Sequence, residues 1–257
     1  MSVLIAIPVY NEVGYVRGVL ERVKEYADNI LIIDDGSTDG TPEILNELRE
    51  PMNLDIIRHT TNLGYGKAII ESFERGLRDG YDWVITMDCD EQHEPGHIPE
   101  FMDAIARDDM DIISGSRYLN LDAETEIAPA DRRAINMTLS SEINDRLGYT
   151  LTDSFCGFKA HRVSAMARIH LTETGYAFPM QLWAQAAAHN LRIGEIEVDL
   201  IYNDPNRTFG GGLDDAEHRL AHYREVFASE LKLAEQQVAV LANSASESAC
   251  KSPCRCC

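Results

Sequence analysis

Two aspartates separated by a single residue, Asp88 and Asp90, follow the largely apolar run at 83–87. Side chains two positions apart in an extended chain point to the same side, so both carboxylates could bind one cation. Carboxylate oxygens suit hard divalent ions such as Mg²⁺ or Mn²⁺, and such an ion would in turn hold phosphate oxygens. A D-x-D triplet also occurs in many surface turns. Its position at the end of an apolar run favours a metal site.

Three further polar features accompany this pair. His93 could add a metal ligand or a phosphate donor, and it could equally be an exposed loop residue. The stretch "DDGSTDGT" at 34–41 predicts a tight turn and a helix cap, and one of its aspartates could also bind a nucleotide base or ribose. The stretch "NLGYGKA" at 62–68 places two glycines at a helix start, where they allow a ligand to approach closely or simply end a strand. It lacks the spacing of a P-loop.

The elements that must position these residues alternate along the first half of the chain. Short apolar runs predict strands at 3–9, 29–34, 54–59, 82–88 and 110–116. Helical patterns lie between them at 15–24, 42–49, 66–78 and 99–106. This alternation predicts an α/β, Rossmann-like fold with a mostly parallel central sheet and helices on both faces. Ligands of such sheets bind beyond the carboxyl ends of the strands, where the polar stretches lie.

The alternation weakens after residue 118. A polar connector at 119–131 leads into a helix at 132–147, and a turn at 151–161 leads into a short strand or hairpin. We expect a helix at 179–189, a strand at 192–202, a loop at 203–212 and a long C-terminal helix from 215 to about 242. The remaining residues, 243–257, have the composition of a disordered tail rich in cysteine. The rest of the chain, 1–242, is expected to form one domain.

Composition limits the classes of function. The 257 residues carry a formal net charge of −20, which argues against nucleic-acid binding and against attachment to an anionic membrane by charge alone. No run of apolar residues is long enough to span a membrane, and the start of the chain has no basic region typical of a signal peptide. Only Cys89 and Cys156 of the six cysteines lie in the body of the chain, so we expect a reduced, cytoplasmic protein.

The four cysteines at the end of the chain leave three interpretations open. The segment could be an incidental disordered end, which we favour, a site for a soft metal such as Zn²⁺, or a lipidated end that lacks the C-a-a-X pattern.

The order of five motifs carries a family resemblance. "IPVYNE", "DDGSTDGT", "NLGYGKA", "MDCDEQHEP" and "GSRY" resemble the motifs of family 2 glycosyltransferases, which have the GT-A fold. The D-x-D-x-Q-H form followed by "DSFCGFKA" is similar to polyprenol-phosphate sugar transferases, including the dolichol-phosphate mannose synthases. The resemblance spans about residues 3–210. It implies that residues 1–118 bind the nucleotide sugar and that residues 119–242 form the acceptor half.

The resemblance also implies three sets of site residues. The nucleotide sugar would contact Pro8, Tyr10, Glu12, Asp35, Lys67, Asp88 and Arg207. The metal ion and the diphosphate would be held by Asp88, Asp90 and Gln92. The catalytic residues would be Asp153, Arg117, Arg132 and Arg133. Asp153 falls where many inverting members place an acid near the acceptor, and either Arg132 or Arg133 would contact phosphate.

The implied reaction is inverting, Mg²⁺- or Mn²⁺-dependent transfer of a sugar from GDP-mannose or a UDP-sugar. A polyprenyl or dolichyl phosphate at a membrane surface is the first acceptor to consider, and a soluble or glycan hydroxyl is the second. Asp153 could serve as general base for a hydroxyl, whereas a phosphate is already ionised. The stretch "NRTFGGGLDDAEHR" lacks the lysine that these synthases place after the late arginine, which weakens the lipid acceptor. The rival hypotheses are a nucleotidyltransferase and a non-catalytic nucleotide-sugar-binding protein.

Overall fold

The computed structural model describes residues 1–120, 130–201 and 211–249; at 130–132, 211 and 235–249 it describes the backbone alone. Its centre is a seven-stranded sheet with the strand order β3-β2-β1-β4-β6-β5-β7. The strands are β1 Val3–Val9, β2 Ile30–Asp34, β3 Leu54–Arg58, β4 Trp83–Thr86, β5 Ile112–Ser116, β6 Lys159–Arg162 and β7 Ile193–Glu197. All neighbouring strands are parallel except β6, which runs antiparallel to both β4 and β5.

Alternating side chains of the central strands enter two separate cores. On β1, Ile5 and Ile7 belong to one apolar cluster, whereas Leu4 and Ala6 belong to the other. Burial on both faces is what a continuous apolar run such as "VLIAIPV" requires. The predicted α/β class with a mostly parallel sheet is therefore confirmed.

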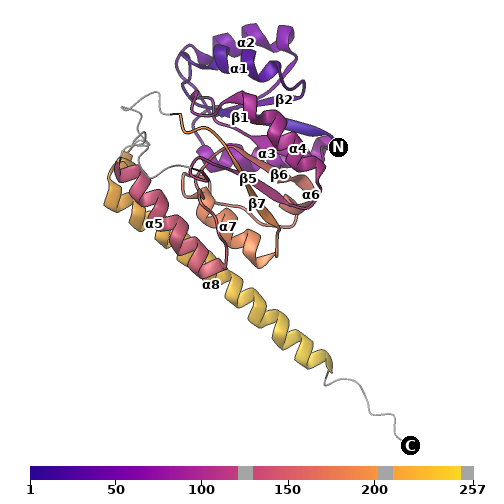
Figure 1. Ribbon diagram of the computed structural model, residues 1–257, viewed down its shortest axis with the longest axis vertical. Coiled ribbons are helices and arrows are strands. Elements are labelled where there is room, and N and C mark those ends of the chain that lie inside the picture. The colour runs from indigo at the N-terminus through magenta and orange to yellow at the C-terminus, as the bar shows by residue number, and fades with distance from the viewer. Residues whose placement is uncertain (121–129, 202–210, 250–257) are drawn as a thin grey trace, which may run out of the picture.

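Helices cover both faces of the sheet (Figure 1). One core receives apolar side chains from α1 Val16–Lys24, α2 Thr41–Met52 and α4 Ile98–Ala106, which follows the short 3₁₀ helix η1 Pro95–His97. The other core receives them from α3 Tyr65–Asp79, α5 Ala130–Leu147, α6 Val163–Met166, α7 Phe178–Ala188 and α8 Ala216–Ala249, which follows η2 Gly211–Asp214. Figure 1 shows α5 and α8 side by side and the C-terminal part of α8 extending beyond the rest of the molecule.

Two elements differ from the sequence-based expectation. The strand expected at 192–202 is limited to β7, because its partner β5 ends at Ser116. The C-terminal helix continues to Ala249, past the expected end near residue 242, so the first seven residues of the expected disordered tail are helical. The stretch 243–249 contains no glycine or proline, and its alanine, serine and glutamate residues are compatible with a helix. The cysteines at 250–257 lie outside the described residues.

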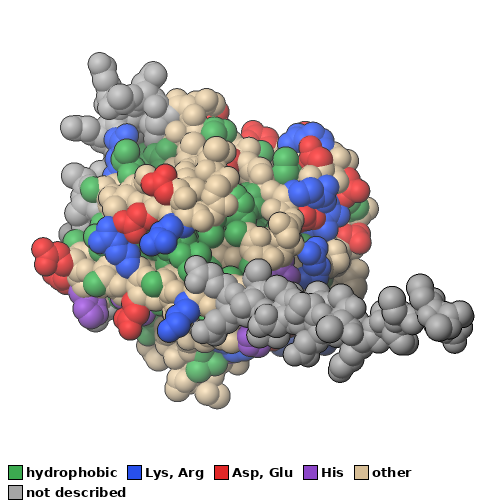
Figure 2. Space-filling view, turned by 90° about the horizontal axis from the view of Figure 1, so that it is seen from below, with side chains coloured by type: hydrophobic (Ala, Val, Ile, Leu, Met, Phe, Trp, Pro, Cys, Tyr) green, Lys and Arg blue, Asp and Glu red, His purple; other side chains and the backbone are tan. Residues whose placement is uncertain are grey.

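The described surface has a mixed character. Figure 2 shows acidic and basic side chains interspersed on one face, with hydrophobic side chains between them. Among the helices described, none combines the length and the apolar character needed to cross a membrane.

Candidate active site

A cavity of about 410 Å³ lies at the carboxyl edge of the parallel strands. Part of its polar wall consists of side chains that follow four strands, namely Tyr10, Glu12, Asp35, Asp88, Asp90, Gln92, Arg117 and Tyr118, and Pro8 near the end of β1 lies beside them. These residues are far apart in the sequence, and they converge because parallel strands end at the same edge of the sheet. The expected position of the site, beyond the strand ends, is therefore where the structure has its cavity.

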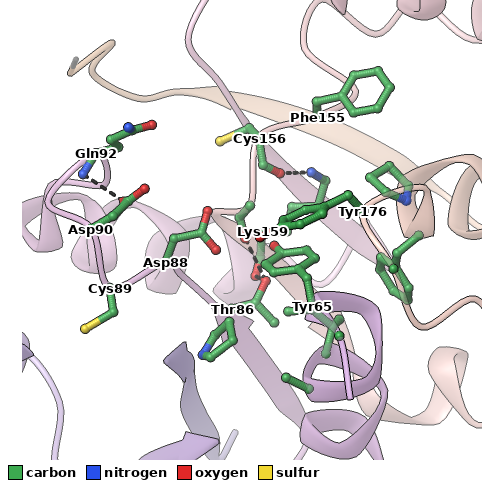
Figure 3. A pocket seen from close by; sticks show the side chains of 18 of the residues that line it. Tyr65, Thr86, Asp88, Cys89, Asp90, Gln92, Phe155, Cys156, Lys159 and Tyr176 are labelled. Atoms are coloured by element: carbon green, nitrogen blue, oxygen red, sulfur yellow. Dashed lines mark hydrogen bonds between the residues drawn. The ribbon is translucent and has the colours of Figure 1, made fainter. Parts of the chain in front are cut away.

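Asp88 and Asp90 both line this cavity (Figure 3). Their carboxylates lie on one side of the chain, and the intervening Cys89 points to the other side, where it is buried against the core. Asp90 is 9% exposed, and its Oδ1 accepts a hydrogen bond of 3.1 Å from the backbone N–H of Gln92. The two-residue spacing therefore places both acids on the same side, as the sequence predicted.

The carboxylate of Asp88 is confined by two residues that the sequence did not identify. A Cβ atom on Gly157 would lie 2.5 Å from Asp88 Oδ2, so the glycine leaves the space that this carboxylate occupies. Tyr65, at the start of α3, lies near Asp88, and burial together with the charge of this acid holds the pKa of the tyrosine well above its usual value. The hydroxyl therefore stays protonated near pH 7.

His93 supports the aspartate loop from within the core. Its ring is buried, packs against Phe158 at 5.4 Å between centroids, and its Nδ1 accepts a 2.9 Å hydrogen bond from the backbone N–H of Asp88. Burial lowers the pKa of His93 to about 4, so the imidazole is neutral near pH 7. The idea of an exposed loop histidine is wrong. A role as metal ligand through Nδ1 is not available, because that atom already holds the backbone of Asp88.

Arg117 and Asp153 form a buried ion pair beside the cavity. Arg117 Nε lies 2.6 Å from Asp153 Oδ2, Nη2 lies 3.0 Å from Oδ1, and the backbone N–H of Arg117 adds a third contact at 3.2 Å. Asp153 is fully buried and is absent from the cavity wall, whereas Arg117 lines it. Burial alone would raise the pKa of Asp153, but the charge and hydrogen bonds of Arg117 lower it below its usual value. In this arrangement the carboxylate orients Arg117, and the general-base role of Asp153 stays a prediction.

Asp35 also has its carboxylate engaged within the protein. It accepts hydrogen bonds from the backbone N–H groups of Leu63 and Gly64, at 2.7 and 2.9 Å, and lies 2.6 Å from Nδ1 of His59. Burial would lower the pKa of His59, but its hydrogen bonds to Asp35 and to Glu71 raise it. Asp35 lines the cavity and at the same time fixes the "NLG" loop to the end of β2.

The remaining cationic candidates are distributed differently. Lys67 Nζ pairs with Glu71 at 2.9 Å, and Lys67 is not among the residues that line the cavity. The guanidinium of Arg133 lies 6.0 Å from the ring centroid of Tyr118, a residue of the cavity wall. The side chain of Arg132 and the whole of Arg207 lie outside the described residues.

Several residues of the cavity were missed by the sequence reasoning. The polar ones include Tyr65, Thr86, Tyr118, Asn136, Lys159, His161, Tyr176 and Arg219. The apolar ones include Ala68, Ile69, Ile135, Phe155, Phe178, Leu182 and Tyr223. The alternation of "FKAH" could have indicated that Lys159 and His161 share one face of a strand. Apart from Phe155, which lies in the loop before β6, these residues come from four helices, and only the packing of those helices brings them together.

The donor set at the aspartate pair fits a hard divalent cation. Asp88 and Asp90 offer carboxylate oxygens on one side of the cavity, and Gln92 lines the cavity beside them. Within the described residues, no group of three or more His, Cys, Asp and Glu side chains could enclose a metal ion by itself. Two carboxylates suit Mg²⁺ or Mn²⁺, which usually take their other ligands from water and substrate phosphates.

The sheet, its covering helices and the acids at its carboxyl edge define a GT-A glycosyltransferase. Solved structures of glucosyl-3-phosphoglycerate synthase from Mycobacterium tuberculosis share this fold. The complex with Mn²⁺, UDP-glucose and phosphoglyceric acid has a TM-score of 0.69 at 15% identity, covering 90% of this chain and 80% of that one. The complex with Mg²⁺ and UDP has a TM-score of 0.65 at 16% identity, covering 90% and 79%.

Residues 4–169 match the family described as glycosyl transferase family 2, so the chain belongs to this family and is a glycosyltransferase. It is 29% identical over 211 residues to undecaprenyl-phosphate mannosyltransferase of Micrococcus luteus, covering 78% of this chain and 84% of that protein. It is 30% identical over 218 residues to UDP-N-acetylglucosamine–dolichyl-phosphate N-acetylglucosaminyltransferase of Methanococcus voltae, covering 79% and 86%. The polyprenol monophosphomannose synthase of Mycolicibacterium smegmatis is 29% identical over 202 residues, covering 76% of each chain. The resemblance to polyprenol-phosphate sugar transferases is thereby confirmed.

Proposed function

We propose that this protein transfers a sugar from a nucleoside diphosphate sugar to a polyprenyl phosphate, with inversion at the anomeric carbon and with bound Mg²⁺ or Mn²⁺. The observation that carries the proposal is the pair Asp88 and Asp90 on one side of a cavity that is also lined by many apolar side chains. The names of three relatives, each of which pairs a sugar with a polyprenol or dolichol phosphate, support this acceptor class. GDP-mannose and UDP-sugars are the donors to consider.

Stabilisation of the leaving diphosphate is the main catalytic requirement. Asp88 and Asp90, with Gln92, would hold the divalent cation, which supplies positive charge next to the diphosphate. Arg117 is locked in place by two hydrogen bonds from its guanidinium to Asp153, so its orientation is fixed before substrate binds. Arg132, Arg133 and Arg207 remain predicted phosphate contacts.

The acceptor phosphate needs no general base. A phosphomonoester is mostly ionised at neutral pH, because its second pKa is about 6. One of its oxygens attacks the anomeric carbon while the bond from that carbon to the β-phosphate oxygen breaks, and the nucleoside diphosphate leaves with the bonding electrons. A positioning role of Asp153 is compatible with this reaction, whereas a hydroxyl acceptor would require a general base.

The nucleotide part of the donor is proposed to lie along the ends of β1 and β2. Pro8, Tyr10 and Glu12 line the cavity there, and Tyr10 presents a ring that is 45% exposed. Asp35 would contribute mainly by holding the "NLG" loop that shapes this wall. Lys67 pairs with Glu71, which in turn contacts His59, so Lys67 would help to hold the same loop. Residues 1–118 would thus supply the donor side and residues 119–242 the acceptor side, at a cytoplasmic membrane surface.

A binding panel followed by a transfer assay tests this proposal. The full-length protein is titrated with GDP-mannose, UDP-glucose and UDP-N-acetylglucosamine with and without Mn²⁺, and the donor that binds is then incubated with undecaprenyl phosphate, undecaprenol and a soluble glycan. We expect metal-dependent transfer to the phosphate and none to the alcohol. Transfer to the glycan alone, or binding without turnover, would exclude the proposed acceptor.

A further inference from the structure

Lys159 is a buried cation in the wall of the active-site cavity. It is the first residue of β6, the antiparallel strand between β4 and β5. Side chains alternate along this strand, so Lys159 and His161 line the cavity, while Ala160 enters the core on the opposite face. The insertion of β6 into the parallel sheet therefore brings a lysine next to the strand end that carries Asp88.

The residues around Lys159 do not satisfy all the N–H donors of its ammonium group. The side chain is 5% exposed, its Nζ donates to the carbonyl oxygen of Cys156, and Nζ lies 5.5 Å from the ring centroid of Trp183. Throughout the part of the chain that the structure describes, Nζ has no second hydrogen-bond acceptor and no carboxylate within ion-pair distance. An ammonium group has three N–H donors, and its burial is costly unless a counter-charge is near. The carboxylates of Asp153 and Asp88 are near but make no ion pair with Nζ, so an anionic substrate would add a counter-charge in direct contact.

The cavity changes character at this lysine. Asp88 and Arg117 lie on its polar side, and the charges of Asp153, Arg117 and Asp88 all act on the Lys159 ammonium. Helices α3, α5, α7 and α8 contribute mainly apolar residues, namely Ala68, Ile69, Ile135, Phe178, Leu182 and Tyr223, together with the polar Asn136 and Arg219. His161 is kept neutral by burial, which lowers its pKa to about 3. A ligand that spans the boundary must therefore combine an anionic group with an apolar body.

We propose that Lys159 binds the phosphate group of the acceptor, and that the first carbons of the acceptor chain lie against the apolar wall beyond it. This assignment rests on the proposed function, because it takes the acceptor to be an alkyl phosphate. Lys159 would supply the positive charge for the acceptor phosphate, for which the stretch "NRTFGGGLDDAEHR" has no lysine. Lys159 comes from "DSFCGFKA" instead, and the fold brings it to the cavity.

Kinetics with a short acceptor test the assignment. Citronellyl phosphate is used with the donor and Mn²⁺, and Lys159→Met is compared with the wild type and with Lys232→Met, which removes an exposed lysine of α8. We expect Lys159→Met to raise the KM for citronellyl phosphate by about tenfold to hundredfold, which is the effect of losing a hydrogen bond from a charged group. The Kd for donor and Mn²⁺ should change by less than about twofold. Lys232→Met should behave as the wild type.

The folded state is controlled separately. Replacing a buried charge with an apolar residue of similar volume is often neutral or stabilising, so the thermal midpoint of Lys159→Met should not fall. If this variant does not fold, Lys159→Gln gives the same kinetic prediction, since it keeps one N–H donor for the Cys156 carbonyl and loses the charge. Binding of citronellyl phosphate, citronellol and inorganic phosphate to the wild type separates the two parts of the ligand. The alkyl phosphate should bind at least about tenfold more tightly than either of the others.

The outcomes separate this assignment from the proposed function. If the wild type uses citronellyl phosphate and Lys159→Met has the same KM for it, Lys159 does not bind the acceptor and the proposed function stands. If the variant loses donor affinity instead, the lysine belongs to the donor diphosphate and the assignment is wrong. If inorganic phosphate binds as tightly as the alkyl phosphate, the apolar wall contributes nothing. If the wild type uses no alkyl phosphate, the assignment of Lys159 and the proposed function are both wrong.

Discussion

Gly157→Ala is the sharpest test of the aspartate site, because it moves Asp88 without changing any charge. The added Cβ would lie 2.5 Å from Asp88 Oδ2 and 2.9 Å from its Cγ and Oδ1. An unstrained contact needs roughly 3.5 Å, so the carboxylate must move by about 1 Å. The chain itself tolerates alanine here, since Gly157 is not one of the glycines with positive φ.

A displacement of this size should be costly for catalysis and mild for stability. We expect kcat to fall by about 10²-fold, as for other misplacements of about 1 Å. The Mn²⁺ concentration that gives half-maximal rate should rise by about 10- to 100-fold, as for changes in groups that orient a metal ligand. The Asp88 side chain is 31% exposed and faces the cavity, so it can move without unpacking the core. The thermal midpoint should therefore shift by only a few degrees.

A Mn²⁺ titration of the initial rate with donor and citronellyl phosphate measures both effects. Gly14→Ala is the matched control, because a Cβ there meets no heavy atom within 4 Å. It should leave the rate and the Mn²⁺ dependence unchanged. If Gly157→Ala has wild-type kcat and Mn²⁺ dependence while remaining folded, the position of the Asp88 carboxylate does not matter for turnover. The metal site would then have to be placed elsewhere.

Three other perturbations test different parts of the site. Asp90→Ala should reduce metal-dependent turnover by at least about 10²-fold with little change in unfolding midpoint, since a strand-end acid is not part of the apolar core; full activity would exclude the metal role. Asp153→Asn should lower the free energy of unfolding by about 3–5 kcal/mol in urea titrations, because Arg117 loses its buried carboxylate. A lower rate with unchanged stability would instead support Asp153 as a general base. His93 and His161 have pKa values of about 4 and about 3 in the folded protein, against about 6.5 when unfolded, so the unfolded chain binds more protons at mildly acidic pH. Stability should therefore fall as the pH drops from about 6.5 to 4, and His93→Gln should flatten that slope; an equal slope in the variant would contradict the burial argument.

The sequence by itself determined the fold class and the edge of the sheet that carries the site. Runs such as "VLIAIPV" between helical patterns require strands buried on both faces, and the structure confirms them. The D-x-D spacing determined that Asp88 and Asp90 face one side, because the side-chain period of an extended chain is two. These are local properties of the chain, and they can be derived from the order of residue types.

Only the tertiary structure decided which partners these residues meet. The pairing of Arg117 with Asp153, and the approach of Lys159 and Gly157 to Asp88, depend on β6 entering the sheet antiparallel between β4 and β5. A four-residue strand does not specify its neighbours or its direction by hydrophobic pattern, since either direction buries the same residues. Such long-range contacts decide whether a carboxylate acts as a general base or orients a neighbouring arginine. They also decide whether a lysine is exposed or buried, and spacing along the chain does not.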